Sequence, residues 1–215
     1  MYKRRPSSEL NELFAHKPYQ GVVPSQTTFL FVGLDANYDA RISEKPIFAD
    51  VREYHEDGVA FWLRHHVHHP FLLPAYLGDG RFYHRSFARI GFRPEHAGLV
   101  SFAELLDVPT VGRNRLEPSD LDRAHLRWLN AAILEGAAKH VFLPSAVSRL
   151  MRASGEFAWL PAAPIDNGGA LGILHRSDSK TVYSHLHFSV YGRFESRKVA
   201  QASAIASLLP PTHQR

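Results

Sequence analysis

One carboxylate stands directly after an apolar segment of the chain. Residues 27–32 read Thr-Thr-Phe-Leu-Phe-Val, and Gly33 and Asp35 follow. A β-branched and aromatic run that ends at a glycine is typical of a buried central strand, and the glycine allows a sharp turn. Asp35 would then project at the strand end, where it could orient water or offset positive charge. The same residues also fit an ordinary turn, because Asp and Asn are good turn formers.

Two histidines lie together near the C-terminus, in the segment Tyr183 to Ser189. If the strand continues to this point, His185 and His187 share one face of it, because side chains alternate along a strand. A metal site would need a third ligand with fixed geometry. Two hydrogen-bonded histidines at the edge of a sheet fit the pattern equally well.

A run of four histidines occupies residues 65–69, interrupted only by Val67. His65 and His69 are one helical turn apart and could bind zinc together. The glutamate of the zincin motif is missing, because His66 stands in its place. Histidines also favour a helix C-terminus for electrostatic reasons. We expect that His65, His66, His68 and His69 do not form a catalytic metal site.

The predicted elements place the candidate residues at strand ends. Apolar and β-branched runs predict strands at residues 27–32, 99–102, 140–143, 170–174 and 181–187. Helical spacing of apolar residues predicts helices at residues 8–16, 50–67, 83–90, 120–138, 145–154 and 195–209. Strands that alternate with helices predict an α/β fold, a three-layer αβα sandwich around a mainly parallel, open central sheet. Ligands bind at the carboxyl ends of the strands in such sheets.

Helix ends are predicted from capping residues. Asp50 followed by Glu53 has the pattern of a capping box that opens the helix over residues 50–67. Ser119 and Ser145 are the expected N-caps of the two later helices, and Gly155 is expected to end the second of them.

The composition is that of one globular domain over residues 1–215, with 45% hydrophobic and 21% charged residues. The chain has no cysteine, which excludes a disulfide framework, a thiolate nucleophile and an iron–sulfur cluster. A net charge of +4 permits contact with phosphates. No stretch approaches the roughly 18 apolar residues that span a bilayer, so no membrane association is expected. The expected location is the cytoplasm.

Three segments together resemble the uracil-DNA glycosylase superfamily. Gly33-Leu34-Asp35-Ala36-Asn37-Tyr38 resembles its first motif, which follows the first sheet strand and supplies the residue that activates water. Asp35 stands at the third position, as in the uracil-specific enzymes. Ala36 replaces the usual proline, and Tyr38 comes one place late.

The middle of the chain is similar to the mismatch-specific thymine/uracil branch. This similarity covers residues 85–92, 98–100 and 105–110, where a helix ending in Gly-Phe leads to a strand and an Asp-x-Pro-Thr turn. His185-Leu186-His187-Phe188-Ser189 resembles the second motif, which begins with histidine. Phe48 lies thirteen residues after Asp35, about where the family keeps the aromatic that stacks on the flipped base. The resemblance extends over residues 27–191.

The resemblance implies hydrolysis of the N-glycosidic bond of a deaminated or mismatched base, uracil or hypoxanthine, in DNA. Asp35 would orient water, and His185 would donate a hydrogen bond to the departing base. The base would be flipped out of the duplex. The expected base-binding residues are Tyr38, Phe48, Ser101 and His187. The expected DNA-binding residues are Phe188 or Tyr191 as an apolar wedge, with Arg193 and Arg197 on phosphates. No metal, organic cofactor or obligate protein partner is implied.

Two other functions remain open at this point. One is a nucleic-acid or nucleotide-binding module on the same fold without catalysis. The other is a metal-dependent hydrolase that uses the histidines. Sensitivity of any activity to a chelator would distinguish the metal-dependent hydrolase from the glycosylase.

Overall fold

The central element of the structure is a six-stranded sheet. A computed structural model describes residues 7–112 and 115–210. The sheet has the strand order β1-β4-β2-β6-β8-β7. Its strands are β1 (Tyr19–Gly21), β2 (Phe29–Gly33), β4 (Val100–Glu104), β6 (His140–Pro144), β7 (Gly172–Arg176) and β8 (Thr181–His185).

The four inner strands are parallel, and the two edge strands are antiparallel. β2 pairs in parallel with β4 on one side and with β6 on the other, and β6 pairs in parallel with β8. β1 and β7 run antiparallel to their neighbours. A two-stranded parallel sheet, β3 (Asn37–Tyr38) with β5 (Thr110–Val111), continues from the ends of β2 and β4.

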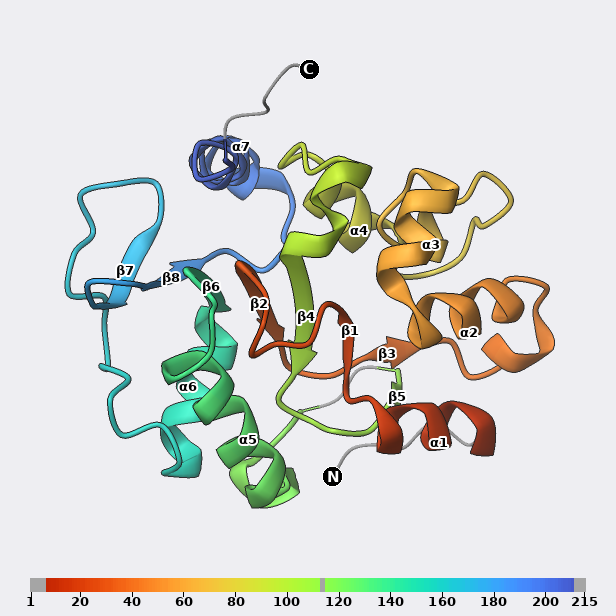
Figure 1. Ribbon diagram of the computed structural model, residues 1–215, viewed down its shortest axis with the longest axis horizontal. Coiled ribbons are helices and arrows are strands. Elements are labelled where there is room, and N and C mark those ends of the chain that lie inside the picture. The colour runs from red at the N-terminus through yellow and green to blue at the C-terminus, as the bar shows by residue number, and fades with distance from the viewer. Residues whose placement is uncertain (1–6, 113–114, 211–215) are drawn as a thin grey trace.

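Seven α-helices accompany the sheet in the described residues: α1 (Ser8–His16), α2 (Phe48–Glu56), α3 (Gly58–His65), α4 (Arg81–Ala88), α5 (Arg123–Leu134), α6 (Ser145–Ser154) and α7 (Glu195–Ala206). Short 3-10 helices lie at η1 (Ile42–Glu44), η2 (Pro70–Leu72), η3 (Pro94–Leu99), η4 (Pro118–Asp120) and η5 (Gly192–Phe194). Figure 1 shows α5 and α6 on one side of the sheet and α3, α4 and α7 on the other.

Alternation along β2 explains these layers. Leu30 and Val32 point into a core built with α5 and α6. Phe29 and Phe31 point to the opposite face, into a core that includes residues of α3, α4 and α7. A strand that is apolar at every position must be covered on both faces, which is the αβα arrangement the sequence predicts. The mainly parallel three-layer fold is therefore confirmed.

Several predicted helix boundaries are wrong, because other residues than the predicted ones cap the helices. The segment at residues 50–67 forms two helices, because Asp57 accepts a hydrogen bond from the Ala60 N–H and caps α3. Asp50 lies inside α2 and caps nothing. Asp122, and not Ser119, caps α5 through the His125 N–H.

No helix in the described part of the chain is long and apolar enough to cross a membrane.

Candidate active site

The loop that follows β2 is held beside the segment that follows β4. The backbone N–H groups of Leu105 and Leu106 donate to the carbonyls of Gly33 and Leu34, at 3.0 Å each. The Thr110 N–H donates to the Ala36 carbonyl at 2.9 Å. These bonds extend the β2–β4 pairing past the carboxyl edge of the sheet. Residues 33–38 therefore have a fixed path, and Asp35 lies at the edge where the sequence places it.

Asp35 is oriented by a hydrogen-bonded side chain from the neighbouring segment. The buried Thr110 hydroxyl donates to Asp35 Oδ2. The same hydroxyl accepts from Asn37 Nδ2 at 3.1 Å. The chain Asn37 to Thr110 to Asp35 thus fixes one oxygen of a half-buried carboxylate.

A second acidic residue, Glu104, lies at the end of β4 next to Asp35. Gly33 is its partner in the pairing of β2 with β4, and a Cβ added to Gly33 would lie 1.9 Å from Glu104 Oε2. The Glu104 side chain therefore occupies the space that any other residue at position 33 would fill. Burial raises the pKa of the Glu104 carboxyl well above its usual range, and the charge of Asp35 raises it further.

Aromatic hydroxyls lie near Glu104. Burial raises the pKa of Tyr38 and Tyr83, and the charge of Glu104 adds to both shifts. Tyr54 is affected in the same way, mainly by burial. Glu104 therefore lies in a low-dielectric environment that favours its neutral, protonated form.

His187 is the histidine on which the charge of Asp35 acts. Burial lowers the pKa of His187, and Asp35 partly offsets that effect. The ring of Tyr83 lies beside it, with 5.3 Å between ring centroids. The Ser189 N–H donates to His187 Nδ1 at 3.2 Å. We call Asp35, Glu104, Thr110 and His187 the carboxylate cluster.

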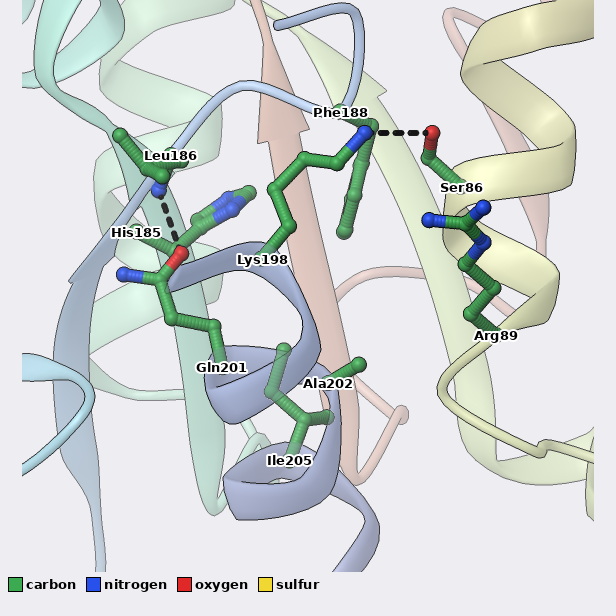
Figure 2. A pocket seen from close by; sticks show the side chains of 9 residues that line it. All are labelled: Ser86, Arg89, His185, Leu186, Phe188, Lys198, Gln201, Ala202 and Ile205. Atoms are coloured by element: carbon green, nitrogen blue, oxygen red, sulfur yellow. Dashed lines mark hydrogen bonds between the residues drawn. The ribbon is translucent and has the colours of Figure 1, made fainter. Parts of the chain in front are cut away.

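His185 lies apart, under helix α7. It ends β8, and its ring packs against Phe188 and Phe142, with centroids 5.0 Å and 6.3 Å away. Burial lowers its pKa to about 3, and the charge that acts on it is that of His187. Figure 2 shows His185 extending into a small pocket bordered by Phe188, Lys198 and Gln201.

Helix α7 holds the loop between β8 and η5 at both ends. Gln201 Oε1 accepts from the Leu186 N–H at 2.9 Å (Figure 2). The buried Lys198 ammonium donates to the Ser86 hydroxyl on α4 at 3.2 Å (Figure 2). It also donates to the Val190 carbonyl at 2.8 Å. The loop that carries His187 is therefore tied to α4 and α7.

The structure corrects some of the predicted contact residues. Phe188 is buried against Phe31, Tyr83 and Phe87, so it is not an exposed wedge. Ser101 is buried within β4, where it pairs with Leu30 and Gly21, away from the carboxyl edge. It is not placed to contact a base.

The other predicted contact residues fall into two groups. Tyr38 and Phe48 pack into one core cluster with Phe71, and neither ring is open to solvent. Tyr191 is 77% exposed, and Arg193 and Arg197 are also exposed.

The histidine run is divided among different environments. His65 lies with Asp50 and Glu53, where ligand atoms are within 4.8 Å of one another, but Glu53 is paired with Arg64 at 2.6 Å and with His65 at 3.2 Å. His66 ends α3 with a left-handed backbone, φ 57°.

The other two histidines of the run are buried beside a third one from α4. His68 Nε2 lies 3.3 Å from His84 Nδ1, and the His69 ring stacks on His84 with 3.5 Å between centroids. Burial lowers the pKa of all three, that of His68 to about 3.

Two members of the carboxylate cluster have no role that the sequence alone predicts. Glu104 ends a short apolar strand, as Asp35 follows one, and that shared pattern is the signal that identifies it. Thr110 belongs to the Asp-Val-Pro-Thr turn, whose pairing with residues 36–38 depends on tertiary structure.

No protein-family model matches the chain, and no curated protein matches its sequence significantly.

Proposed function

We propose that this protein is a monofunctional DNA glycosylase that releases a deaminated base, uracil or hypoxanthine, without a metal. The observation that carries the proposal is Asp35, held by Thr110 at the carboxyl edge of the central strand. The charge of Asp35 also raises the pKa of His187 against the effect of burial. The motif resemblance of residues 33–38 and 185–189 supports the same function.

The proposed reaction needs two aids. Hydrolysis of an N-glycosidic bond passes through an oxocarbenium-like transition state, with positive charge on the sugar and negative charge on the departing base. A carboxylate near the sugar orients water and offsets the positive charge, which is the role we assign to Asp35. A donor near the base stabilises the negative charge.

His187 fits the donor role better than His185. Its lowered pKa keeps the imidazole neutral at pH 7, with one N–H. Because the Ser189 N–H donates to Nδ1, Nδ1 is the acceptor and the proton lies on Nε2. His187 thus has a defined donor, and Asp35 lies close enough for its charge to act on that ring. His185, first in the motif, lies under α7 instead.

Glu104 completes the site in this proposal. A protonated carboxyl offers both a donor and an acceptor, which suits the edge of a base. Burial and the charge of Asp35 raise the pKa of the carboxyl and so favour that form.

The test is an oligonucleotide panel with uracil, hypoxanthine, xanthine and thymine mismatches in single- and double-stranded DNA. Base release is scored by cleavage at abasic sites, with and without a chelator. We expect release of at least one deaminated base, unchanged by chelation. Asp35→Asn, which keeps a water-orienting amide, should lower the rate without abolishing it. His187→Ala should lower it about 100- to 1000-fold.

His185→Ala is the matched control. His185→Ala should lower thermal stability. The rate of its folded fraction should be much closer to the parent's rate than the rate of His187→Ala is. Equal rates for the parent and for both Asp35 and His187 variants would reject the site. Absence of release from every substrate would reject the enzyme.

A binding module without catalysis is the second candidate. The burial of Tyr38 and Phe48 favours it, because neither ring offers an open face for a flipped base. Binding of DNA with no base release from any panel member would support it.

A further inference from the structure

Two large aromatic side chains are exposed together at the junction of α4 with the loop before α7. Phe82 is 48% exposed and Tyr191 is 77% exposed. Their ring centroids lie 6.5 Å apart, and the ring planes are perpendicular, at 89°. They lie far apart in the sequence, so tertiary structure creates the pair. Exposed rings that meet in this way form a corner with two apolar walls.

The corner is built on a rigid support. Lys198 lies under Phe82, with Nζ 4.7 Å from the ring centroid. The same ammonium bonds to the Val190 carbonyl, next to Tyr191, and to Ser86 on α4. Arg89, directly after α4, and Glu195 of α7 form an ion pair. One buried lysine therefore fixes both walls of the corner.

Three arginines belong to the same segments as the pair. Arg85 lies one helical turn after Phe82 on α4, Arg193 is two residues after Tyr191, and Arg197 precedes Lys198 on α7; all three are exposed. In the described part of the chain, Glu195 pairs with Arg89 and Lys198 instead, and the exposed carboxylate of Asp79 lies three residues before Phe82, so the arginines outnumber the acidic groups here. Exposed rings among arginines match the chemistry of a single-stranded polynucleotide, whose bases stack while its phosphates meet cations.

We propose that Phe82 and Tyr191 form a stacking corner for one unpaired base of a DNA strand. One ring takes the face of the base, and the perpendicular ring packs against its edge. The faces of paired bases in a duplex are covered by their neighbours, so only an unstacked base can enter. The proposal deepens the proposed function, on which it rests, by naming the form of the substrate, a strand with an unpaired base.

The experiment measures binding without catalysis. The probe is an undamaged single-stranded oligonucleotide with 2-aminopurine at one position, whose fluorescence reports stacking, compared with the same sequence as a duplex. We expect tighter binding of the single strand and quenched fluorescence on binding. Tyr191→Ala and Phe82→Ala should each weaken that binding about 5- to 150-fold, the range for removal of one base–aromatic stack.

Controls separate stacking from other effects. Tyr191→Phe keeps the ring and should bind like the parent. Leu77→Ala removes another exposed apolar side chain, 85% exposed, and should also bind like the parent. Arg85→Gln, Arg193→Gln or Arg197→Gln should reduce the slope of log affinity against log salt by about 0.7 for each phosphate that is no longer neutralised. Tyr191→Ala should leave that slope unchanged.

The outcomes are distinct from those of the glycosylase assay. Binding that depends on Tyr191 and Phe82 without base release upholds the corner and rejects the enzyme. Base release together with binding that is unaffected by Tyr191→Ala and Phe82→Ala rejects the corner. Sedimentation showing that the parent self-associates and Tyr191→Ala does not would assign the patch to a second copy of the chain and would also reject the proposal.

Discussion

Gly33 determines how two acidic side chains share one site. Because a Cβ at this position would meet Glu104 Oε2 at 1.9 Å, the absence of a side chain allows Glu104 to lie beside Asp35. Gly33→Ala should force the Glu104 carboxyl away and lower base release about 100-fold, the scale for small misplacements in a site. Gly98→Ala, where an added Cβ meets nothing within 4 Å, is the matched control and should behave like the parent. Rates on the oligonucleotide panel measure both.

The protonation state of Glu104 should make base release depend on pH. Its pKa is raised by burial and by Asp35, so the carboxyl is neutral at low pH and loses its proton as the pH rises through that raised value. Activity that needs the neutral form should therefore fall at the alkaline end. Glu104→Gln keeps a neutral donor and acceptor, so the rate at pH 7 should persist and the alkaline loss should disappear. A pH–rate profile that is identical in both proteins would contradict this role for Glu104.

At the scale of elements, the break between α2 and α3 can be tested directly. Asp57→Ala removes the cap of α3 and should lower the free energy of unfolding by about 1 kcal/mol. Asp50→Ala removes the carboxylate that the sequence pattern predicts as the cap, yet its side chain caps nothing. Its effect should stay within about 0.5 kcal/mol. Denaturant titration of both variants compares the two positions, and a larger loss for Asp50→Ala would contradict the observed boundary.

The sequence predicts those elements whose own residues specify them. β2, β4, β6 and β8 are short apolar runs, and α1 has the same bounds in the sequence analysis and in the structure. β3 and β5 have two residues each and exist only because residues 37–38 pair with 110–111. No local pattern specifies such a pairing.

The same distinction applies to the residues of the candidate site: some can be predicted from the local sequence, and others depend on tertiary structure. Asp35 can be identified from the sequence because an apolar strand ends just before it. The roles of His185 and His187 cannot be separated by sequence period, because the strand ends at His185 and the loop turns before His187. Phe188 is buried because tertiary packing brings Phe31 and Phe87 against it.

For the whole molecule, buried histidines should limit stability in acid. Burial lowers the pKa of His55 to about 4 and that of His68 and His185 to about 3, and it lowers those of His69 and His84 as well. These rings are neutral in the folded protein but take up protons in the unfolded chain near pH 6.5. Stability should therefore be full above pH 6.5 and fall as the pH drops, by up to about 1.4 kcal/mol per pH unit for each ring.

Glu104 has the opposite effect on how stability changes with pH. Its raised pKa favours the folded state at low pH, and this contribution is lost as the pH rises through the raised value. One carboxyl offsets only one of these rings, so the free energy of unfolding should still increase from pH 4.5 to pH 6.5. Denaturant titrations across that range measure it. His68→Gln should reduce the slope, whereas a variant of the exposed His66 should leave it unchanged.

The order of strands in the sheet also affects how the chain folds during synthesis. β2 needs both β4 and β6 beside it, but roughly 110 residues separate β2 from β6 along the chain. At a ribosomal rate of about 5–20 residues per second, β6 is synthesised about 5–20 s after the apolar Phe29–Gly33 segment. Throughout that interval one edge of β2 is open to pairing with other chains. We therefore expect the nascent chain to aggregate more readily before β6 is synthesised than after it.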